Sequence, residues 1–219
     1  MPEIEALPQP PRAARAQVLA AIAKLPAGAW IAADADNTLW AGDVGDEVVH
    51  AAAIAPHDPW QAGVVSLEQY VTLMDHSYAD GCRFSAQLLA SVDPLLARAR
   101  LKELFATRVK PRTWLIAALQ EAMARGVNLV VISASPLPAV QLGLELFGLS
   151  GADVIGLECT LTPAPTFVEP IPVGFGKPAA LLAQGRPRPD LALGDSRWDL
   201  PLLHHAHAAC WLIPASDEL

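Results

Sequence analysis

Two aspartates follow directly on an apolar run in the first part of the sequence. The run spans residues 29–33, and Asp34 and Asp36 come after it, followed by Asn37 and Thr38. An apolar run of this length that stops at a charged turn is typical of a buried strand of a parallel sheet. Because side chains alternate along a strand, both carboxylates can point the same way at its carboxyl end, where open α/β sheets bind ligands. Crowded carboxylates favour a hard divalent cation, Mg²⁺ above all, beside a carboxylate free to act as a nucleophile. The alternative is a polar turn in which Asp36 and Thr38 only cap a helix.

A second apolar run, residues 129–132, ends in the hydroxyl of Ser133. Ser133 and the backbone N–H groups that follow it, beginning at Ala134, could hold a phosphoryl oxygen at a helix N-terminus. Pro136 fits the first turn of that helix, where its missing N–H would have no partner. The alternative is that Ser133 and Ser135 only cap the helix.

Two later segments add a lysine and two further acids. Lys177 precedes Pro178 at a predicted helix start, where a cation opposes the helix dipole, so an anionic pocket explains it better than a local stabilising role. The plain alternative is a solvated surface lysine. Asp195 ends the apolar run 191–194, and Asp199 lies four residues later, so both could face one pocket. Asp195 could complete a cation site, and Asp199 could hold either Lys177 or a metal-bound water.

In this order and spacing, the four segments resemble the motifs of the haloacid dehalogenase superfamily, in particular its phosphoserine-phosphatase-like branch. The resemblance covers nearly the whole chain beyond its N-terminal segment. It implies an α/β fold with a Rossmann-like parallel sheet flanked by helices, and a small α-helical cap inserted after the first strand. The catalytic core would comprise residues 1–42 and 110–219, and the cap residues 43–109.

The resemblance also implies a role for each motif residue. Asp34 matches the nucleophile that takes the phosphoryl group, and Asp36 matches the general acid and base, its backbone carbonyl being a metal ligand. Ser133 matches the phosphoryl-binding hydroxyl, and Lys177 the lysine that neutralises the nucleophile and the transferring group. Asp195 matches a direct Mg²⁺ ligand beside Asp34, and Asp199 the acid that supports this metal site.

These roles describe a Mg²⁺-dependent phosphatase that hydrolyses a small phosphate monoester through an aspartyl-phosphate. A phosphotransferase with an alcohol acceptor would use the same core. A catalytically silent small-molecule-binding protein is disfavoured because a binder needs no pair of carboxylates such as Asp34 and Asp36. Retention of Asp36 also favours phosphoryl chemistry over dehalogenation.

The helical insert is expected to choose the substrate, because a lid over the site contributes substrate-contacting groups. Asp43 stands where phosphoserine phosphatases carry a glutamate that contacts the substrate amino group, and Arg83 could clamp a substrate carboxylate. Solvated surface charges are the alternative for both. Trp40 could stack on a cationic head group or pack in the core. The sequence departs from phosphoserine phosphatases at Asn37 and after Ser133, where they carry a glycine pair, which argues against serine phosphate as the substrate.

Composition narrows the class of protein. Of 219 residues, 53% are hydrophobic and 17% charged, which argues against disorder, and a net charge of −8 without a basic stripe argues against nucleic-acid binding. The resemblance implies a small phosphorylated metabolite as the partner; the sequence does not indicate an oligomeric state. No apolar run approaches the ~20 residues of a membrane span, the N-terminus does not resemble a signal peptide, and three scattered cysteines suggest reduced thiols. A cytoplasmic location is expected. A zinc site is disfavoured because the spacing of the candidate ligands lacks a matched pair; these are His204, His205, His207 and Cys210.

The hydrophobic pattern also places further elements. Helices are predicted over residues 11–25, 66–74 and 92–105, and core strands near residues 128–133, 153–156, 190–194 and 210–213. A Thr- and Pro-rich stretch at 161–172 predicts an extended hairpin.

Overall fold

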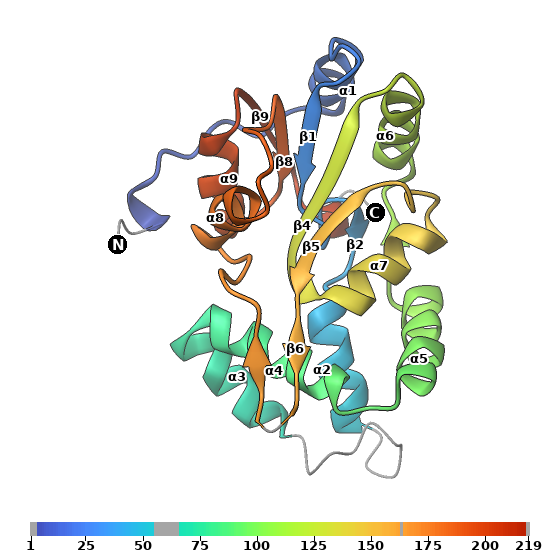
Figure 1. The fold of residues 1–219 in the computed structure, drawn as a ribbon, viewed down its shortest axis with the longest axis vertical. Helices are drawn as coiled ribbons and strands as arrows, with labels where there is room; N and C mark the ends of the chain where they lie inside the picture. The colour runs from blue at the N-terminus through green and yellow to red at the C-terminus, as the bar shows by residue number, and fades with distance from the viewer. Residues whose placement is uncertain (1–3, 55–65, 163, 218–219) are drawn as a thin grey trace.

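The central element is a five-stranded parallel sheet, seen in a computed structural model that describes residues 4–54, 66–162 and 164–217. The strand order is β5-β4-β1-β8-β9 (Figure 1). The strands are β1 (Trp30–Ala33), β4 (Asn128–Pro136), β5 (Asp153–Leu157), β8 (Leu191–Gly194) and β9 (Ala208–Trp211). The predicted α/β fold with a Rossmann-like parallel sheet is confirmed. β9 begins and ends two residues before the predicted strand 210–213. The prediction extended too far because the apolar run continues to Leu212, which is buried although it lies beyond the last paired residue.

Helices cover both faces of the sheet. Ile31 and Ala33 of β1 belong to one buried cluster, whereas Ala32 between them belongs to another, as the two-residue period of a strand requires. The first face packs against α1 (Arg15–Ala23), α6 (Thr113–Ala124) and α7 (Leu137–Leu146), and the second against α8 (Gly176–Ala183) and α9 (Leu200–His205). Burial on both faces explains why the core strands are apolar throughout.

The order of the strands creates a switch point at β1. From β1 the chain continues to β4 and β5 on one side, and later to β8 and β9 on the other. The loops at the carboxyl ends of β1, β4 and β8 therefore diverge, and ligands bind at such a crevice in open α/β sheets.

The segment between β1 and β4 is mainly helical in the part that the structure describes. It contains α2 (Val44–Ile54), α3 (Leu67–His76), α4 (Tyr78–Ala90) and α5 (Pro94–Thr107); residues 55–65 of the predicted cap lie outside the described part. Its two ends lie side by side, because β2 (Trp40–Ala41) pairs antiparallel with β3 (Lys110–Pro111). The division into a core and a cap at residues 43–109 stays a prediction.

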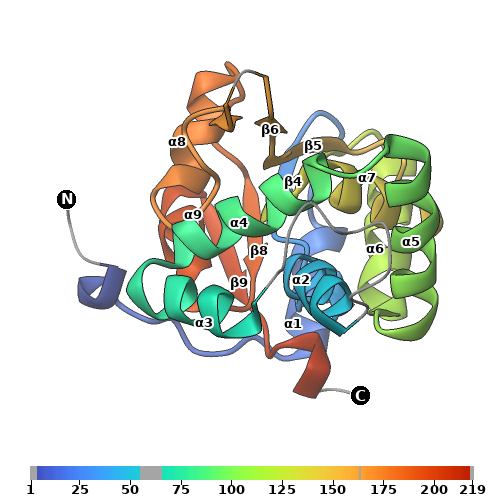
Figure 2. The same cartoon turned by 90° about the horizontal axis from the view of Figure 1, so that it is seen from below.

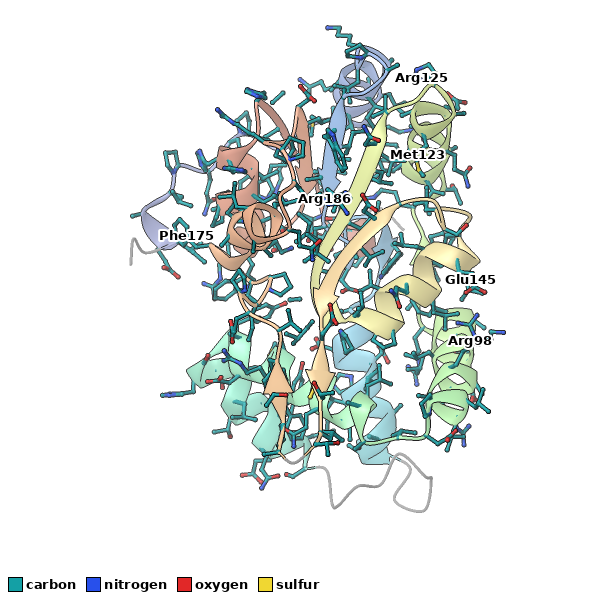
Figure 3. The ribbon with its side chains drawn as sticks, in the orientation of Figure 1. Arg98, Met123, Arg125, Glu145, Phe175 and Arg186 are labelled. Carbon is teal, nitrogen blue, oxygen red and sulfur yellow. The ribbon has the colours of Figure 1, made fainter. Side chains whose placement is uncertain are left out.

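Part of the insert packs firmly on the sheet domain. In the view from the side of the insert, α5 lies beside α7, and α4 crosses in front of the sheet (Figure 2). Trp40 is fully buried and its ring contacts those of Phe105 on α5 and Phe147. The suggestion that Trp40 stacks on a substrate head group is therefore wrong. On the surface, Arg98 of α5 lies next to Glu145 of α7, with Nη2 2.7 Å from each carboxylate oxygen (Figure 3).

The remaining sequence predictions need small adjustments. The predicted hairpin is present, but its strands are β6 (Cys159–Thr160) and β7 (Thr166–Phe167), so it begins before residue 161. Pro136, predicted in the first turn of α7, lies just before this helix, and Pro138 occupies that turn. The histidine and cysteine candidates for zinc form no metal-binding group within the described residues. No helix in the described ranges is both long and apolar enough to cross a bilayer.

Candidate active site

Asp34 lies at the carboxyl end of β1, at the centre of the crevice. Its backbone N–H donates to the carbonyl of Leu193 on β8, which fixes the turn, and its side chain is buried. Lys177 is buried at the start of α8 and its Nζ donates to Asp34 Oδ1 and to Asp199 Oδ1. The lysine is therefore an internal counterion of the site, and the alternative of a solvated surface lysine is wrong.

Asp34 and Lys177 shift each other's pKa. Burial, together with repulsion from Asp199, raises the pKa of Asp34 well above its usual range, and Lys177 opposes that rise. Burial by itself would lower the pKa of Lys177, but Asp199 and Asp34 outweigh it and raise that pKa. Lys177 is thus held as a cation beside a carboxylate that needs positive charge to stay ionised.

Asp199 positions Lys177 and the turn that follows β8. Its Oδ2 accepts the backbone N–H groups of Asp195 at 3.1 Å and Ser196 at 2.9 Å, and the Ser196 hydroxyl at 2.9 Å. With Oδ1 bound to Lys177, both oxygens are engaged, so Asp199 holds the lysine, which is one of the two roles considered for it. Gly194 is required here, because a Cβ at that position would lie 2.5 Å from the Asp199 Cβ.

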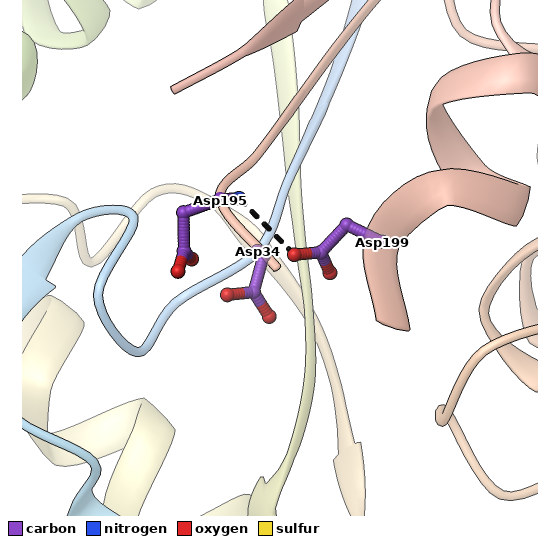
Figure 4. Close-up of side chains that lie close together, drawn as sticks. All are labelled: Asp34, Asp195 and Asp199. Atoms are coloured by element: carbon purple, nitrogen blue, oxygen red, sulfur yellow. Dashed lines mark hydrogen bonds between the residues drawn. The ribbon is translucent and has the colours of Figure 1, made fainter. Parts of the chain in front are cut away.

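Asp34, Asp195 and Asp199 form a group of carboxylates in which one oxygen of each lies within 4.8 Å of the others (Figure 4). Asp195 Oδ1 accepts the Thr38 hydroxyl at 2.7 Å. In the described chain, no hydrogen bond reaches Oδ2 of Asp34 or of Asp195. Burial and repulsion from Asp199 raise the pKa of Asp195 to about 7. Free carboxylate oxygens that repel each other fit a hard divalent cation.

Asp36 is held by four donors. Its Oδ1 accepts Trp40 Nε1 and the Val44 N–H, both at 2.9 Å. Its Oδ2 accepts the Ser135 hydroxyl at 2.6 Å and the Ser133 hydroxyl at 3.3 Å. Burial raises the pKa of Asp36, and these hydrogen bonds oppose the rise. A fixed carboxyl group with a raised pKa is suited to giving and taking a proton.

A family model for haloacid dehalogenase-like hydrolases matches residues 31–204. The chain belongs to this family. The match includes all four motifs, so the predicted membership and the prediction of a hydrolase are confirmed. No curated protein matches the sequence significantly.

Solved structures share the fold of this haloacid dehalogenase-like hydrolase. A family hydrolase from Salmonella enterica serovar Typhi has a TM-score of 0.58 at 18% identity, with 84% of this chain and 62% of that chain covered. A Bordetella pertussis protein of unknown function has a TM-score of 0.63 at 16% identity, covering 81% and 86%. A substrate-bound phosphoserine phosphatase has a TM-score of 0.54 at 16% identity, with 87% of this chain and 89% of that chain covered. The chain thus spans less than two thirds of the Salmonella protein.

Several contacts of the hydrolase site were not predicted. Thr38 and Ser135 were considered only as helix caps, yet they bind Asp195 and Asp36. The alternation of side chains was the available signal for Ser135, which lies two residues after Ser133. Asn37 adopts φ 56°, a left-handed conformation that asparagine tolerates, which explains a residue other than glycine in this turn.

The insert contributes one wall of a cavity above these acids. Asp43 lines it, as do Asp46, Tyr70, Tyr78 and other residues, and Ser133 and Ala134 of β4 line it too. Burial raises the pKa of Asp43 well above its usual range, as do the charges of Asp36 and Asp46. Arg83 is not among the lining residues; its guanidinium lies 2.7 Å from Asp80 and 3.3 Å from Glu169. Arg83 thus lies outside the lining of this cavity, and its contact with a substrate carboxylate stays a prediction.

Proposed function

We propose that this hydrolase is a Mg²⁺-dependent phosphatase that cleaves a small phosphate monoester through an aspartyl-phosphate on Asp34. The observation that carries the proposal is the buried triad in which Lys177 bridges Asp34 and Asp199 at the switch point of the sheet. A lysine kept cationic beside an aspartate with a free Oδ2 is the charge arrangement that attack on a phosphate dianion requires.

The metal site would comprise the free oxygens of Asp34 and Asp195 together with the backbone carbonyl of Asp36. Bound there, Mg²⁺ would neutralise phosphoryl oxygens and the charge of the nucleophile. Asp199 would support the site through Lys177 and the Asp195 backbone rather than as a ligand.

The chain's own residues divide the reaction into two steps. Asp34 attacks phosphorus through the carboxylate oxygen that does not hold the metal while the bond to the leaving oxygen breaks, and Asp36 gives the leaving oxygen its proton. Water then attacks the phosphorus of the aspartyl-phosphate, Asp36 takes the water proton, and phosphate leaves. Ser133 and the N–H of Ala134 bind phosphoryl oxygens, and Lys177 stays protonated throughout.

The test is phosphate release from p-nitrophenyl phosphate, with Mg²⁺ and with EDTA, by wild type and Asp34→Asn. An amide cannot form the acylphosphate, so we expect turnover to fall by at least about 10³-fold in Asp34→Asn, with an unchanged circular dichroism spectrum. Asp75→Asn makes the same change on the exposed surface of α3 and should keep full activity. Hydrolysis by Asp34→Asn at a wild-type rate would refute the proposal.

A further inference from the structure

The main-chain carbonyl of Asp195 lies just past the end of β8. This strand ends at Gly194, and the Gly194 carbonyl still accepts a hydrogen bond from the Leu212 N–H, at 2.8 Å. Asp195 is the next residue and is buried. A buried carbonyl that has left the strand ladder needs a donor from elsewhere, because an unsatisfied one destabilises the fold.

Two side chains outside the four motifs donate to this carbonyl. The indole Nε1 of Trp211, the last residue of β9, lies 2.9 Å from the Asp195 oxygen in a buried contact. Nη1 of Arg12 donates to the same oxygen and to the carbonyl oxygen of Leu212. A carbonyl oxygen has two lone pairs and can accept both donors. The main chain at Asp195 is thus held by two segments that lie far apart in the sequence.

Arg12 reaches Asp195 from the N-terminal arm, residues 4–14. The arm runs past α9 towards α1 (Figure 1). Arg12 pairs in parallel with Trp211, and the Ala13 N–H donates to the Trp211 carbonyl at 2.8 Å. The Arg12 guanidinium lies 3.8 Å from the centre of the Trp211 ring, which makes a cation–π contact. Arg12 and Trp211 therefore act on Asp195 as one unit.

These two donors complete the set of hydrogen bonds around Asp195. Its N–H donates to Asp199 Oδ2 at 3.1 Å, and its Oδ1 accepts the Thr38 hydroxyl at 2.7 Å. With the carbonyl bound to Trp211 and Arg12, Oδ2 is the one polar atom of Asp195 that receives no hydrogen bond in the described chain. This is the oxygen assigned above to the metal. A ligand that is already fixed needs little ordering when a cation binds.

Two simpler accounts of Arg12 explain less. The arm is already attached to the sheet domain by the Ala13 N–H and by His204, whose Nε2 lies 2.8 Å from the Pro8 oxygen. Neither contact involves the Arg12 guanidinium. The positive charge of Arg12 would by itself repel a metal ion. The hydrogen bond to the Asp195 carbonyl accounts for the position of the guanidinium where attachment and charge do not.

We propose that Arg12 and Trp211 are positioning residues of the metal site, which hold the main chain of Asp195 so that its free oxygen is fixed in place before a divalent cation binds. The inference rests on the proposed function, since the metal site is assigned there. Removing a group that fixes a metal ligand from behind typically weakens metal binding by about 10- to 100-fold.

Calorimetric titration of the full chain with Mg²⁺ tests the proposal. Arg12→Lys keeps the charge but loses the guanidinium, and Trp211→Phe keeps an aromatic ring but loses the indole N–H. We expect Kd for Mg²⁺ to rise by about tenfold or more in each variant. Arg188→Lys is the matched control, because Arg188 is also exposed and also donates to two main-chain carbonyls, those of His205 and Ala206. Its Kd should equal that of wild type.

Rescue by metal separates positioning from a purely structural role. With p-nitrophenyl phosphate, the Mg²⁺ concentration that gives half the maximal rate should rise in Arg12→Lys and Trp211→Phe, whereas kcat at saturating Mg²⁺ should match that of wild type. A kcat lowered at every Mg²⁺ concentration would overturn the inference. An unchanged Kd in Arg12→Lys would overturn it too, and this variant alters only an exposed side chain, so it serves even if Trp211→Phe does not fold. Tighter Mg²⁺ binding by Arg12→Met would show that the charge of Arg12 outweighs its hydrogen bonds, which also contradicts the inference.

Amide hydrogen exchange measures how firmly Asp195 is held in the absence of metal. The N–H groups of Asp195 and Ser196 both donate to Asp199 Oδ2, and in the metal-free protein they should exchange faster in Arg12→Lys than in wild type or Arg188→Lys. Unchanged exchange would overturn the inference whether or not the protein hydrolyses phosphate esters. Failure of wild type to bind Mg²⁺ would instead overturn the proposed metal site itself, and the inference with it.

Discussion

At the scale of single residues, the arrangement around Asp36 is the most specific feature of the site. Trp40 Nε1 of β2 and the Val44 N–H at the start of α2 hold one oxygen, and two hydroxyls of β4 hold the other. Such bonds favour the carboxylate form and so oppose the rise in pKa that burial causes. The proton affinity of the proposed acid and base is thus set by both sides of the crevice.

Ser135→Ala should raise the pKa of Asp36 further, because it removes the shortest of these hydrogen bonds. For kcat/KM the acid must be protonated in the free enzyme, so the alkaline limb of the pH profile should move to higher pH. The measurement is kcat/KM for p-nitrophenyl phosphate between pH 5 and pH 9. Ser133→Ala removes a longer hydrogen bond to Asp36 together with the phosphoryl-binding hydroxyl, so it should move the limb less and lower kcat/KM across the whole range. An unmoved limb in Ser135→Ala would show that Asp36 does not control it.

At the scale of elements, the contact between α5 and α7 connects the insert to the sheet domain. Gly143 of α7 lies against the rings of Phe105 and Trp40, and a Cβ there would lie 2.7 Å from Phe105 Cζ and 2.9 Å from Trp40 Cη2. Both aromatic residues are buried, so neither ring can move aside freely. The absence of a side chain at residue 143 therefore allows the two helices to pack closely.

Gly143→Ala should destabilise the protein by about 1–3 kcal/mol through overpacking, although alanine normally improves a helix. Arg98→Ala, which removes an exposed ion pair across the same two helices, should cost less than about 1 kcal/mol. Urea unfolding measures both. Gly151→Ala is the control, because its Cβ would meet only the terminal methyl of Met123, at 3.2 Å. Greater stability in Gly143→Ala would contradict the close packing described.

At the scale of the whole molecule, the folded state gathers acids that the unfolded chain keeps apart. The pKa of Asp195 is about 7 in the folded protein against 3.8 for an unperturbed carboxyl. The folded state therefore binds this proton more tightly than the unfolded state does. In the metal-free protein, Asp195 lowers the free energy of unfolding as the pH rises from about 4 through 7.

Asp195→Asn should remove this penalty while its amide oxygen still accepts the Thr38 hydroxyl. In EDTA, the free energy of unfolding of the variant should exceed that of wild type. This difference should be about 1–3 kcal/mol larger at pH 8 than at pH 5. Added Mg²⁺ should raise the melting temperature of wild type at pH 8, by mass action, and that of the variant far less. Thermal unfolding at both pH values, with and without Mg²⁺, checks both statements. An equal response to Mg²⁺ would remove Asp195 from the metal site.

The sequence by itself determined the sheet and the motif residues at its crevice. Apolar runs that stop at Asp34 and Asp195 mark strand ends, and the run that stops at Ser133 marks the place where the regular pairing of β4 with β5 is interrupted. Parallel strands bring such positions to one edge. These local patterns depend only on the two-residue period of a strand, so they can be recognised without knowing which distant residues come into contact. The resemblance to a known family added a chemical role for each motif residue.

Only the tertiary structure decided which groups meet across the crevice. Lys177 bridges Asp34 and Asp199, Ser135 binds Asp36, and Trp40 fills the core instead of meeting a substrate. Arg83 was a reasonable carboxylate clamp by residue type, but its helix places it beside Asp80 and Glu169. The sequence of a helix does not show which element the helix will pack against, because its direction depends on packing with elements far away in the sequence. The part that the insert plays in lining the cavity therefore became visible only when α2, α3 and α4 were placed over the sheet.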